Sequence, residues 1–267
     1  MKQISILGCG WLGLPMGQRL IECGFTVKGS TTSDAKIADL RISNIIPYKI
    51  EINNDNAIGA IADFLNNSEI LLINIPPKFR SSTHADYSAK MKSLIPFIEA
   101  STISKVIFVS STSVYPDNNE EITENTTICP ETESGNQLLE AEKVLQENPT
   151  FTTTVIRFGG LIGNNRHPVN SLAGRKNIEN PKAPINLIHL DDCIGIIEKV
   201  IDADYWGEIL NGVTPFHPTR EVYYHQKAIE NNLPLPEFNH QQPSIGKTIS
   251  SLKTVNSLKY TFKVNPL

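Results

Sequence analysis

Short apolar runs alternate along the chain with segments in which apolar residues recur at helical spacing. Residues 70–73 and 106–109 are continuously apolar, as expected of strands that helices cover on both faces. Alternation of this kind is typical of β-α-β units around a parallel sheet. The pattern predicts seven strands, at residues 3–7, 26–29, 47–52, 69–75, 105–110, 152–157 and 208–211.

Four segments between these strands carry apolar stripes with the 3.6-residue period of an amphipathic helix. The first ends at Gly24, and the fourth begins at Asp191 and Asp192, whose side chains suit a helix N-cap. A further helical pattern covers residues 219–231. The four stripes comprise Leu12, Met16, Leu20 and Cys23; Tyr87, Met91, Leu94 and Ile98; Leu138, Ala141 and Leu145; and Cys193, Ile197 and Val200.

The composition excludes several classes of protein. The 24 basic and 28 acidic residues give a net charge of −4, which is not the basic footprint that nucleic acid requires. No stretch approaches the roughly 20 apolar residues of a bilayer span. The four cysteines form no CxxC pair, and the six histidines form no metal-binding motif. We therefore expect a cytoplasmic protein with reduced thiols, without a metal, nucleic-acid or membrane partner.

A glycine-rich segment, GCGWLG from Gly8 onward, stands between the first predicted strand and the first predicted helix. In this context the GxGxxG pattern predicts dinucleotide binding. Gly8 permits a tight turn, Gly10 lets the backbone approach a pyrophosphate, and Gly13 allows close packing of the helix. The anion would lie against amides at the helix N-terminus, with Trp11 and Leu12 in contact. The alternative interpretation is a turn that binds nothing.

The end of the second strand bears on which dinucleotide is bound. An NAD site usually places Asp or Glu about 20 residues past the glycines, to hold the ribose 2′-hydroxyl. This chain reads VKGSTTS there, without a carboxylate to repel a 2′-phosphate, and Lys28 and Lys36 are nearby cations. We expect NADP in preference to NAD, with contacts from Ser30, Thr31 and Thr32. Alternatively, these hydroxyls only cap the next helix.

Other strand ends complete the expected cofactor site, because ligands of open α/β sheets bind at the carboxyl ends of the strands. Asn74 and Pro76 lie at the end of the fourth strand, Ser110 ends the fifth, and Gly160 and Leu161 follow the sixth. We expect all five to contact the cofactor. Asn74 could instead satisfy local backbone amides.

These signals predict a Rossmann-type, doubly wound parallel sheet with strand order 3-2-1-4-5-6-7 and a crevice between strands one and four. Residues 1–163 are expected to form the dinucleotide-binding domain, to which 186–203 and a strand near 208–211 return. After about residue 164, Asn, His, Pro and Gly become frequent. We expect 164–185 and 212–267 to form a smaller, mixed substrate lobe.

The fifth strand delivers a cluster of hydroxyls in the sequence SSTSVY, at residues 110–115. Here the chain resembles the extended short-chain dehydrogenase/reductases, the NAD(P)-dependent epimerase/dehydratase family, whose fifth strand ends in SSxSVYG. RFGGLIG at 157–163 is similar to the family's RxxGxYG, and NLIHLDD at 186–192 to its IHxDD. GNNRHP at 163–168 and the tail from Gly246 resemble the atypical YeeZ-like branch of bacterial epimerases.

The chain departs from this family at the two central catalytic positions. Members carry YGxSK, with Glu eight residues after the tyrosine and Leu three residues further on. Here Ser134 and Leu138 precede Glu142 and Leu145 in that register. The resemblance implies that Ser134 replaces the tyrosine general acid/base and Leu138 the lysine that lowers its pKa. A serine hydroxyl does not ionise usefully near neutral pH without an adjacent base, so the usual mechanism is not expected.

Other residues are candidates for chemistry. The resemblance implies that Ser111 hydrogen-bonds a substrate hydroxyl or carbonyl, the alternative being a strand-end cap. Tyr115 is a second catalytic candidate, or a packing residue. His167 could act as acid/base or bind substrate phosphate with Arg166, or be a solvated loop histidine. His189 is a substrate contact, or it orders the start of the following helix.

A second tyrosine–lysine pair, Tyr223 and Lys227, has the YxxxK spacing but lies in the C-terminal region, where this spacing is ordinary on a helix. Two functions therefore stay open. One is an NAD(P)-dependent oxidoreductase or epimerase/dehydratase acting on a nucleotide-linked or phosphorylated sugar. The other is a non-catalytic NADP-binding sensor or regulatory protein. A structural protein without cofactor conflicts with the glycine segment, and a homodimer is compatible with either function.

Overall fold

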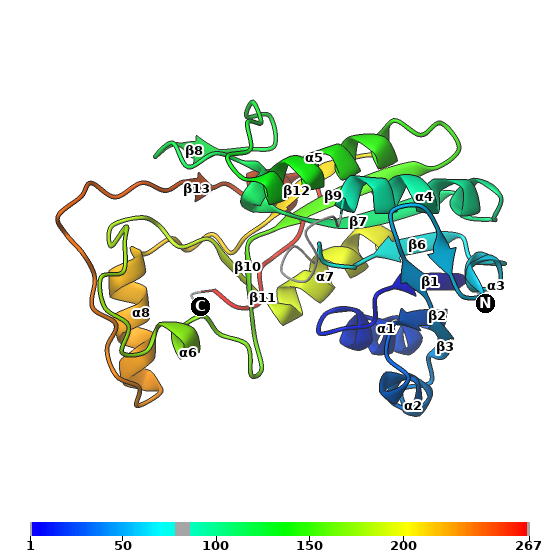
Figure 1. Ribbon diagram of the computed structural model, residues 1–267, viewed down its shortest axis with the longest axis horizontal. Helices are drawn as coiled ribbons and strands as arrows, with labels where there is room; N and C mark the ends of the chain where they lie inside the picture. The colour runs from blue at the N-terminus through cyan, green and yellow to red at the C-terminus, as the bar shows by residue number, and fades with distance from the viewer. Residues whose placement is uncertain (1, 78–85, 266–267) are drawn as a thin grey trace.

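A parallel sheet of seven strands runs through the centre of the molecule (Figure 1). The computed structural model describes residues 2–77 and 86–265. The sheet order β12-β9-β7-β6-β1-β2-β3 reproduces the predicted order, so the doubly wound fold class is confirmed. Its strands are β1 (Gln3–Leu7), β2 (Thr26–Thr31), β3 (Ile46–Lys49), β6 (Ile70–Ile73), β7 (Lys105–Ser111), β9 (Thr152–Phe158) and β12 (Ile209–Gly212).

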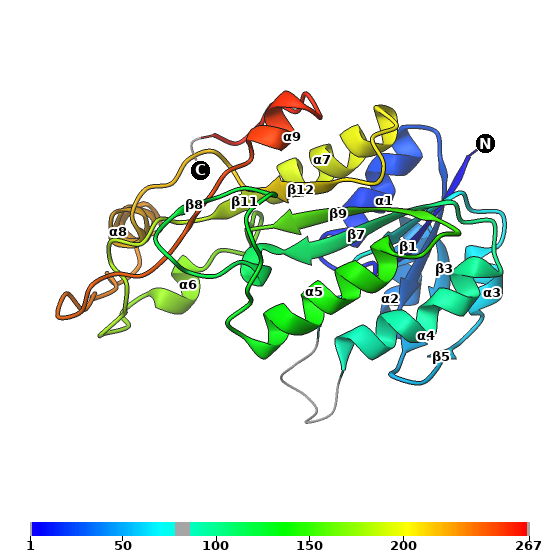
Figure 2. The same cartoon turned by 90° about the horizontal axis from the view of Figure 1, so that it is seen from above.

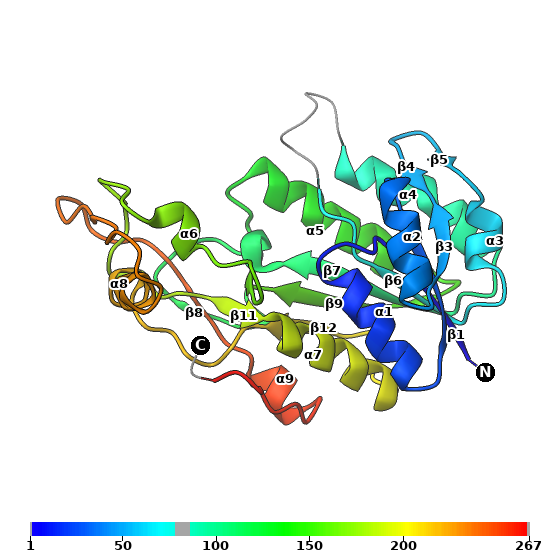
Figure 3. The same cartoon turned by 90° about the horizontal axis from the view of Figure 1, so that it is seen from below.

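Helices cover both faces of this sheet (Figures 1 and 3). On β6, Ile70 and Leu72 pack in the cluster under α1 and α7, whereas Leu71 and Ile73 pack in the cluster under α4 and α5. The continuously apolar run in the sequence therefore reflects burial on both sides. One face carries α1 (Gly13–Glu22), α2 (Ala35–Ile42) and α7 (Leu190–Asp202), and the other α3 (Ile61–Leu65), α4 (Tyr87–Glu99) and α5 (Glu133–Gln146). Among the described helices, none has the length and apolar character needed to cross a bilayer.

A smaller group of elements lies beyond the carboxyl ends of the strands. Figure 2 shows the arrowheads of β7 and β9 pointing toward α6 (Val169–Leu172) and α8 (Arg220–Glu230). These helices share a third apolar cluster that includes Tyr223 and Ala228. Beside them, β10 (Gly160–Ile162) pairs in parallel with β11 (Leu187–His189).

The C-terminal segment crosses back over the sheet. Its strand β13 (Thr248–Ile249) pairs with β8 (Glu121–Ile122), and α9 (Leu252–Asn256) follows. The fully buried Asp192 of α7 then accepts hydrogen bonds from the Tyr260 hydroxyl at 2.8 Å, and from the amides of Lys263 at 2.7 Å and Val264 at 3.2 Å. One carboxylate thus fixes the end of the described chain.

The structure corrects several predicted boundaries. The strand expected at 47–52 is divided: β3 belongs to the central sheet, whereas β4 (Glu51–Ile52) pairs antiparallel with β5 (Ala57–Ile58). Helix α7 begins at Leu190 and is capped by His189, not by the two aspartates. The sequence pattern also did not predict α2, α3, or the 3₁₀ turn η1 (Thr112–Val114).

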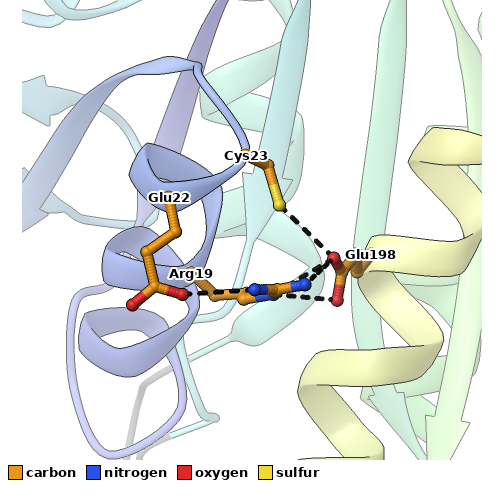
Figure 4. A network of polar contacts seen from close by, with 4 residues as sticks. All are labelled: Arg19, Glu22, Cys23 and Glu198. Atoms are coloured by element: carbon orange, nitrogen blue, oxygen red, sulfur yellow. Dashed lines mark hydrogen bonds and ion pairs between the residues drawn. The ribbon is translucent and has the colours of Figure 1, made fainter.

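Two helices on one face of the sheet are joined by a polar network (Figure 4). Arg19 of α1 donates two hydrogen bonds to the carboxylate of Glu198 on α7 through Nε, both at 3.1 Å, and a third through Nη2 at 2.6 Å. Arg19 also donates to the Glu22 carboxylate at 3.2 Å, and the Cys23 thiol donates to the Glu198 carboxylate at 3.3 Å. Arg19 thereby lowers the pKa of Glu198. The network lies near the surface and adds little to stability; α1 and α7 also pack together through a shared apolar cluster.

We predict that Asp192→Ala lowers the free energy of unfolding by about 2–4 kcal/mol, because three donors lose their acceptor, at least one of them fully inside the protein. The midpoint of urea unfolding, followed by circular dichroism, measures the change. Asp191→Ala is the matched control, because the neighbouring carboxylate is exposed. Equal stability of the two variants would contradict the anchoring role of Asp192.

Candidate functional site

The glycine segment forms a tight turn between β1 and α1, held by the ends of two neighbouring strands. Gly8 has φ of +103°, a conformation that L side chains rarely adopt. Its amide donates to the Ser30 hydroxyl at 2.9 Å, and the Asn74 side chain donates to its carbonyl at 3.1 Å. The amide of Cys9 donates to the Ser30 carbonyl at 2.8 Å, and burial raises the pKa of the Cys9 thiol to about 12. The turn is therefore rigidly held, with a protonated, buried thiol.

Each glycine of the motif has its own geometric reason. A Cβ at Gly8 would lie 2.7 Å from the Asn74 carbonyl oxygen, and one at Gly13 would lie 2.2 Å from the Gly8 oxygen. A Cβ at Gly10 would meet nothing within 4 Å. Gly8 and Gly13 are therefore required by the packing of the protein itself. Gly10 faces open space at the start of α1, where backbone amides lack partners within the helix.

A first cavity of about 680 Å³ opens on one side of this turn, along the carboxyl ends of β1 and β2. Thr31 and Thr32 line it from the end of β2, and Lys36 lines it from the first turn of α2. Glu51 lines it as well, from a segment that the sequence analysis did not associate with the site. The lining also includes Gly8, Gly10, Ser30, Ile52, Asn53, Asn74, Ile75, Pro76, Tyr87 and Lys90.

The predicted cation Lys28 does not belong to this site. Its ammonium group donates to the backbone carbonyls of Asp63 at 2.6 Å and Asn66 at 2.8 Å, at the end of α3. Its side chain is buried, and this burial lowers the pKa of Lys28. Of the two lysines that the sequence suggested, only Lys36 lines the cavity.

A second cavity of about 400 Å³ adjoins the first and shares Gly10, Asn74, Ile75 and Pro76 with it. β7 contributes Ser110 and Ser111, η1 contributes Ser113, and α5 contributes Ser134 and Leu138. The lining also includes Trp11, Leu12, Leu161 and Arg166. The expected residues of the fourth, fifth and sixth strand ends thus meet here, except Gly160. Ser113 was missed, although it stands in the same run of hydroxyls.

Ser111 and Ser134 face the same cavity from different elements. The Ser111 oxygen accepts a hydrogen bond from the Ser113 amide at 3.1 Å, so the strand-end cap is present and the hydroxyl proton is left to donate. Ser134 lies in the first turn of α5, which Thr132 caps through the Gly135 amide at 3.1 Å. Leu138, one turn later, is only 3% exposed and packs in the core under α4 and α5.

Behind this cavity lies a buried polar network. Glu142 and Arg157, each 1% exposed, form a two-pronged ion pair, and Ser110 donates its hydroxyl proton to the same carboxylate. Arg157 also donates to the Tyr115 hydroxyl at 2.7 Å, and Tyr115 donates to Asn211 at 2.9 Å. The network ties β7, β9, β12 and α5 together just below the strand ends. The sequence analysis named Glu142 only by its spacing from Ser134 and did not predict its ion pair with Arg157.

This network changes the interpretation of Tyr115. Its side chain is 2% exposed, and it does not line either cavity. Burial raises the pKa of Tyr115, so its hydroxyl stays protonated and serves as a buried hydrogen-bonding group. The placement does not support a catalytic role, and the packing alternative fits the structure.

The two candidate histidines, His167 and His189, also lie outside both cavities. His167 Nδ1 accepts a hydrogen bond from the Val169 amide at 3.1 Å, so Nε2 carries the proton and donates to Tyr223 at 2.9 Å. Burial, together with the charge of Lys227, lowers the pKa of His167. His189 accepts from the Asp191 amide at 3.3 Å and caps α7. Neither placement supports catalysis or substrate contact.

The Tyr223 hydroxyl is engaged by His167, and Lys227 forms an ion pair with Glu230 at 2.9 Å. Burial raises the pKa of Tyr223, the reverse of what a tyrosine base needs. The second YxxxK pair is therefore part of the α6–α8 packing. Within residues 2–77 and 86–265, no cluster of three or more His, Cys, Asp or Glu side chains is arranged to hold a metal ion.

Comparison with known proteins finds relatives both by sequence and by structure, and no family model matches the chain. Protein YeeZ of Escherichia coli K12 is 33% identical over 265 residues, which cover 98% of this chain and 96% of YeeZ. A functionally unknown conserved protein from Silicibacter pomeroyi has a TM-score of 0.80 at 20% identity, over 98% of this chain and 94% of its own. UDP-glucuronic acid 4-epimerase from Bacillus cereus, in complex with NAD, has a TM-score of 0.79 at 15% identity, over 98% and 92%. These structural similarities establish the shared fold.

The three glycines lead to a stability test. We predict that Gly13→Ala lowers the free energy of unfolding by about 1–3 kcal/mol, because its Cβ would collide with the Gly8 carbonyl oxygen. Gly10→Ala should change it by no more than about 1 kcal/mol, because the added methyl group meets open space. Thermal unfolding of the two variants against wild type measures both. A Gly10→Ala loss as large as that of Gly13→Ala would show that the turn is not open.

Proposed function

Since the chain belongs to the YeeZ family, we propose that it is an atypical short-chain dehydrogenase/reductase, which binds a nicotinamide dinucleotide and acts as an epimerase/dehydratase-like oxidoreductase. Its substrate in this proposal is a nucleotide-linked or phosphorylated sugar. The observation that carries the proposal is the open side of Gly10, at the N-terminus of α1 and between two adjoining cavities. A pyrophosphate there would leave room for one nucleoside half on each side.

The residues around this turn fit a dinucleotide. Gly10 leaves the space that a pyrophosphate fills, and the first-turn amides of α1 supply hydrogen-bond donors to it. The UDP-glucuronic acid 4-epimerase of Bacillus cereus, which shares the fold, is in complex with NAD. When bound, the nicotinamide ring supplies hydride transfer to or from a sugar carbon. The protein's contribution is to position the two reactants.

We infer that the first cavity holds the adenosine half and prefers NADP. Thr31 and Thr32 offer hydroxyl donors at the end of β2, and Lys36 adds a positive charge on the next helix. Asp34, the nearest acidic residue along the chain, pairs with Lys49 at 2.6 Å and does not line the cavity. Glu51 lines the cavity from β4, on another element. In this proposal a 2′-phosphate beside Lys36 receives hydrogen bonds from the hydroxyls of Thr31 and Thr32, and Glu51 lies on a different element.

In the second cavity, Ser111 is proposed to donate a hydrogen bond to a substrate hydroxyl or carbonyl. Its oxygen is already an acceptor for the Ser113 amide, which orients the hydroxyl proton away from the backbone. Ser134 lies across the cavity at the position of the family's tyrosine. It binds and orients in this proposal, because nothing among its described neighbours would ionise it. We assign the substrate side to 164–185 and to the part of the smaller lobe around α8, because the segment from Thr248 to Val264 returns to the sheet and α7.

A non-catalytic NADP sensor is the second candidate, and one observation favours it. Leu138, at the position of the family's lysine, is buried in the apolar core. A cation that would lower the pKa of a neighbouring acid/base is therefore missing from that position. Both candidate functions require the same proposed cofactor site, so only turnover separates them.

The cofactor proposal predicts the order of affinities. NADP⁺ should bind more tightly than NAD⁺, and Lys36→Gln should weaken NADP⁺ by about tenfold while leaving NAD⁺ unchanged, because only the 2′-phosphate meets the ammonium group. Lys143→Gln, on the exposed part of α5 away from both cavities, is the matched control. Isothermal titration calorimetry measures the affinity of each of the three proteins for both dinucleotides.

The contrary outcomes are distinct. A wild-type protein that binds neither dinucleotide overturns the whole proposal. Tighter NAD⁺ than NADP⁺ binding overturns only the cofactor preference. Gly10→Val should abolish binding of both dinucleotides without unfolding the protein, because its side chain would project into the space reserved for the pyrophosphate.

Turnover separates enzyme from sensor. The NADP⁺-loaded wild type should convert at least one of UDP-glucose, UDP-galactose and UDP-glucuronate, which proton NMR detects as a new anomeric signal even when the cofactor is regenerated. Ser111→Ala should lower the rate by about 10²-fold or more, because a hydrogen bond to the reacting group is lost.

If the wild type converts none of these sugars, Ser134→Tyr combined with Leu138→Lys decides between the two functions. Conversion by the double variant alone, with its fold verified by circular dichroism, supports the sensor. It would mean that the binding site is complete and that only the acid/base pair is missing.

A further inference from the structure

One cationic side chain bridges the smaller lobe and the glycine turn. Arg166 lies at the end of a tight turn in which its amide donates to the Gly163 carbonyl and the Gly163 amide donates to its carbonyl, both at 2.9 Å. Asn164, inside this turn, has φ of +49°. The Arg166 guanidinium carbon lies 5.0 Å from the centre of the Trp11 ring. An arginine of the smaller lobe is thus seated on an aromatic residue of the dinucleotide motif.

The charge of Arg166 is not neutralised by an acidic side chain. Across residues 2–77 and 86–265, no ion pair includes it, whereas Arg19 and Arg157 are each paired with a glutamate. Arg166 is also the one charged side chain in the lining of the second cavity, as far as the described residues go. Among the described lining residues, no carboxylate therefore offsets the positive charge that Arg166 brings to the cavity.

Hydrogen-bond donors surround the same space. Ser111, Ser113 and Ser134 line the cavity with Arg166, and their hydroxyls come from β7, η1 and α5. A guanidinium presents a planar fork that matches a carboxylate or phosphate, and stacking on Trp11 limits the orientations it adopts. Serine hydroxyls can complete the hydrogen bonding of such an anion. Together these groups form a recognition site for an anionic oxygen group.

We propose that Arg166 is the specificity-determining residue of this site and binds a carboxylate or phosphate carried by the substrate near its reacting carbon. The inference rests on the proposed function, because it assumes that the second cavity receives the substrate. The cofactor's pyrophosphate is a second source of the same chemistry. It is expected at the amides beside Gly10, whereas Arg166 lines only the cavity that contains Ser111.

The test compares probes that differ by one anionic group, on protein saturated with NADP⁺. UDP-glucuronate is measured against UDP-glucose, and glucose 6-phosphate against glucose, by isothermal titration calorimetry. In at least one pair the anionic member should bind about tenfold more tightly, and Arg166→Gln should remove that advantage. Arg175→Gln, an exposed arginine of the same lobe outside both cavities, should retain it.

A second readout comes from tryptophan fluorescence. The chain has two tryptophans, and Trp206 lies away from the site, where its indole donates to Asp204 at 2.6 Å and Lys105 covers its ring. Trp206→Phe therefore leaves Trp11 as a local reporter. Binding of the anionic probe should change its emission as the guanidinium turns from the ring toward the anion. Circular dichroism verifies that each variant is folded.

Each outcome decides the matter. An anionic advantage that is absent in both pairs, or that persists in Arg166→Gln, overturns the proposal. A loss of about tenfold in NADP⁺ affinity in Arg166→Gln assigns the guanidinium to the cofactor's pyrophosphate and also overturns it. Failure of the proposed function is observed separately, because wild type would then bind neither dinucleotide before any sugar is added.

Discussion

The hydrogen bonds of Ser30 and Asn74 to Gly8 are the interactions on which the candidate site depends. They fasten the turn after β1 to the ends of β2 and β6, the two strands that flank it in the sheet. Because Gly13 then packs directly on the Gly8 carbonyl, the first helix can begin in only one place. Its unpaired amides, the open side of Gly10 and the two cavities are all consequences of that fixed turn.

The second site-forming constraint is the ion pair of Glu142 and Arg157. Two charges without access to water are tolerated only when they are paired and hydrogen-bonded. Here the Ser110 hydroxyl donates to the Glu142 carboxylate, and the Tyr115 hydroxyl accepts a hydrogen bond from the Arg157 guanidinium. The arrangement fixes the distance between the carboxyl end of β7 and the middle of α5. It thereby sets the distance across which Ser111 and Ser134 face each other, although neither belongs to the network.

Much of the fold could be predicted because the relevant signals are local. The apolar run at Ile70–Ile73 and the glycine spacing state their structural roles within a few residues. The helical pattern at 219–231 predicted α8 (Arg220–Glu230), but its packing against α6 could not be predicted, since it depends on contacts such as His167 to Tyr223, 56 residues apart. Spacing likewise could not reveal that the Lys28 head turns to α3, or that Tyr115 points into the core. A side chain's direction is decided by its distant neighbours, and one sequence carries little trace of them.

The contact between Asp192 of α7 and residues 260–264 affects the order in which parts of the protein can fold during synthesis. The edge strand β12 begins at Ile209, and the Asp192 carboxylate finds its partners only at Tyr260 to Val264. During synthesis, α7 therefore leaves the ribosome long before the residues that satisfy its buried acid exist. Until then the part of α7 that packs against Tyr260 would be exposed to water, and so would the Asp192 carboxylate; exposed apolar surface of this kind is prone to association with other chains. The contact that covers Asp192 thus forms later in synthesis than the edge strand β12, which needs only the already synthesised β9 as its partner.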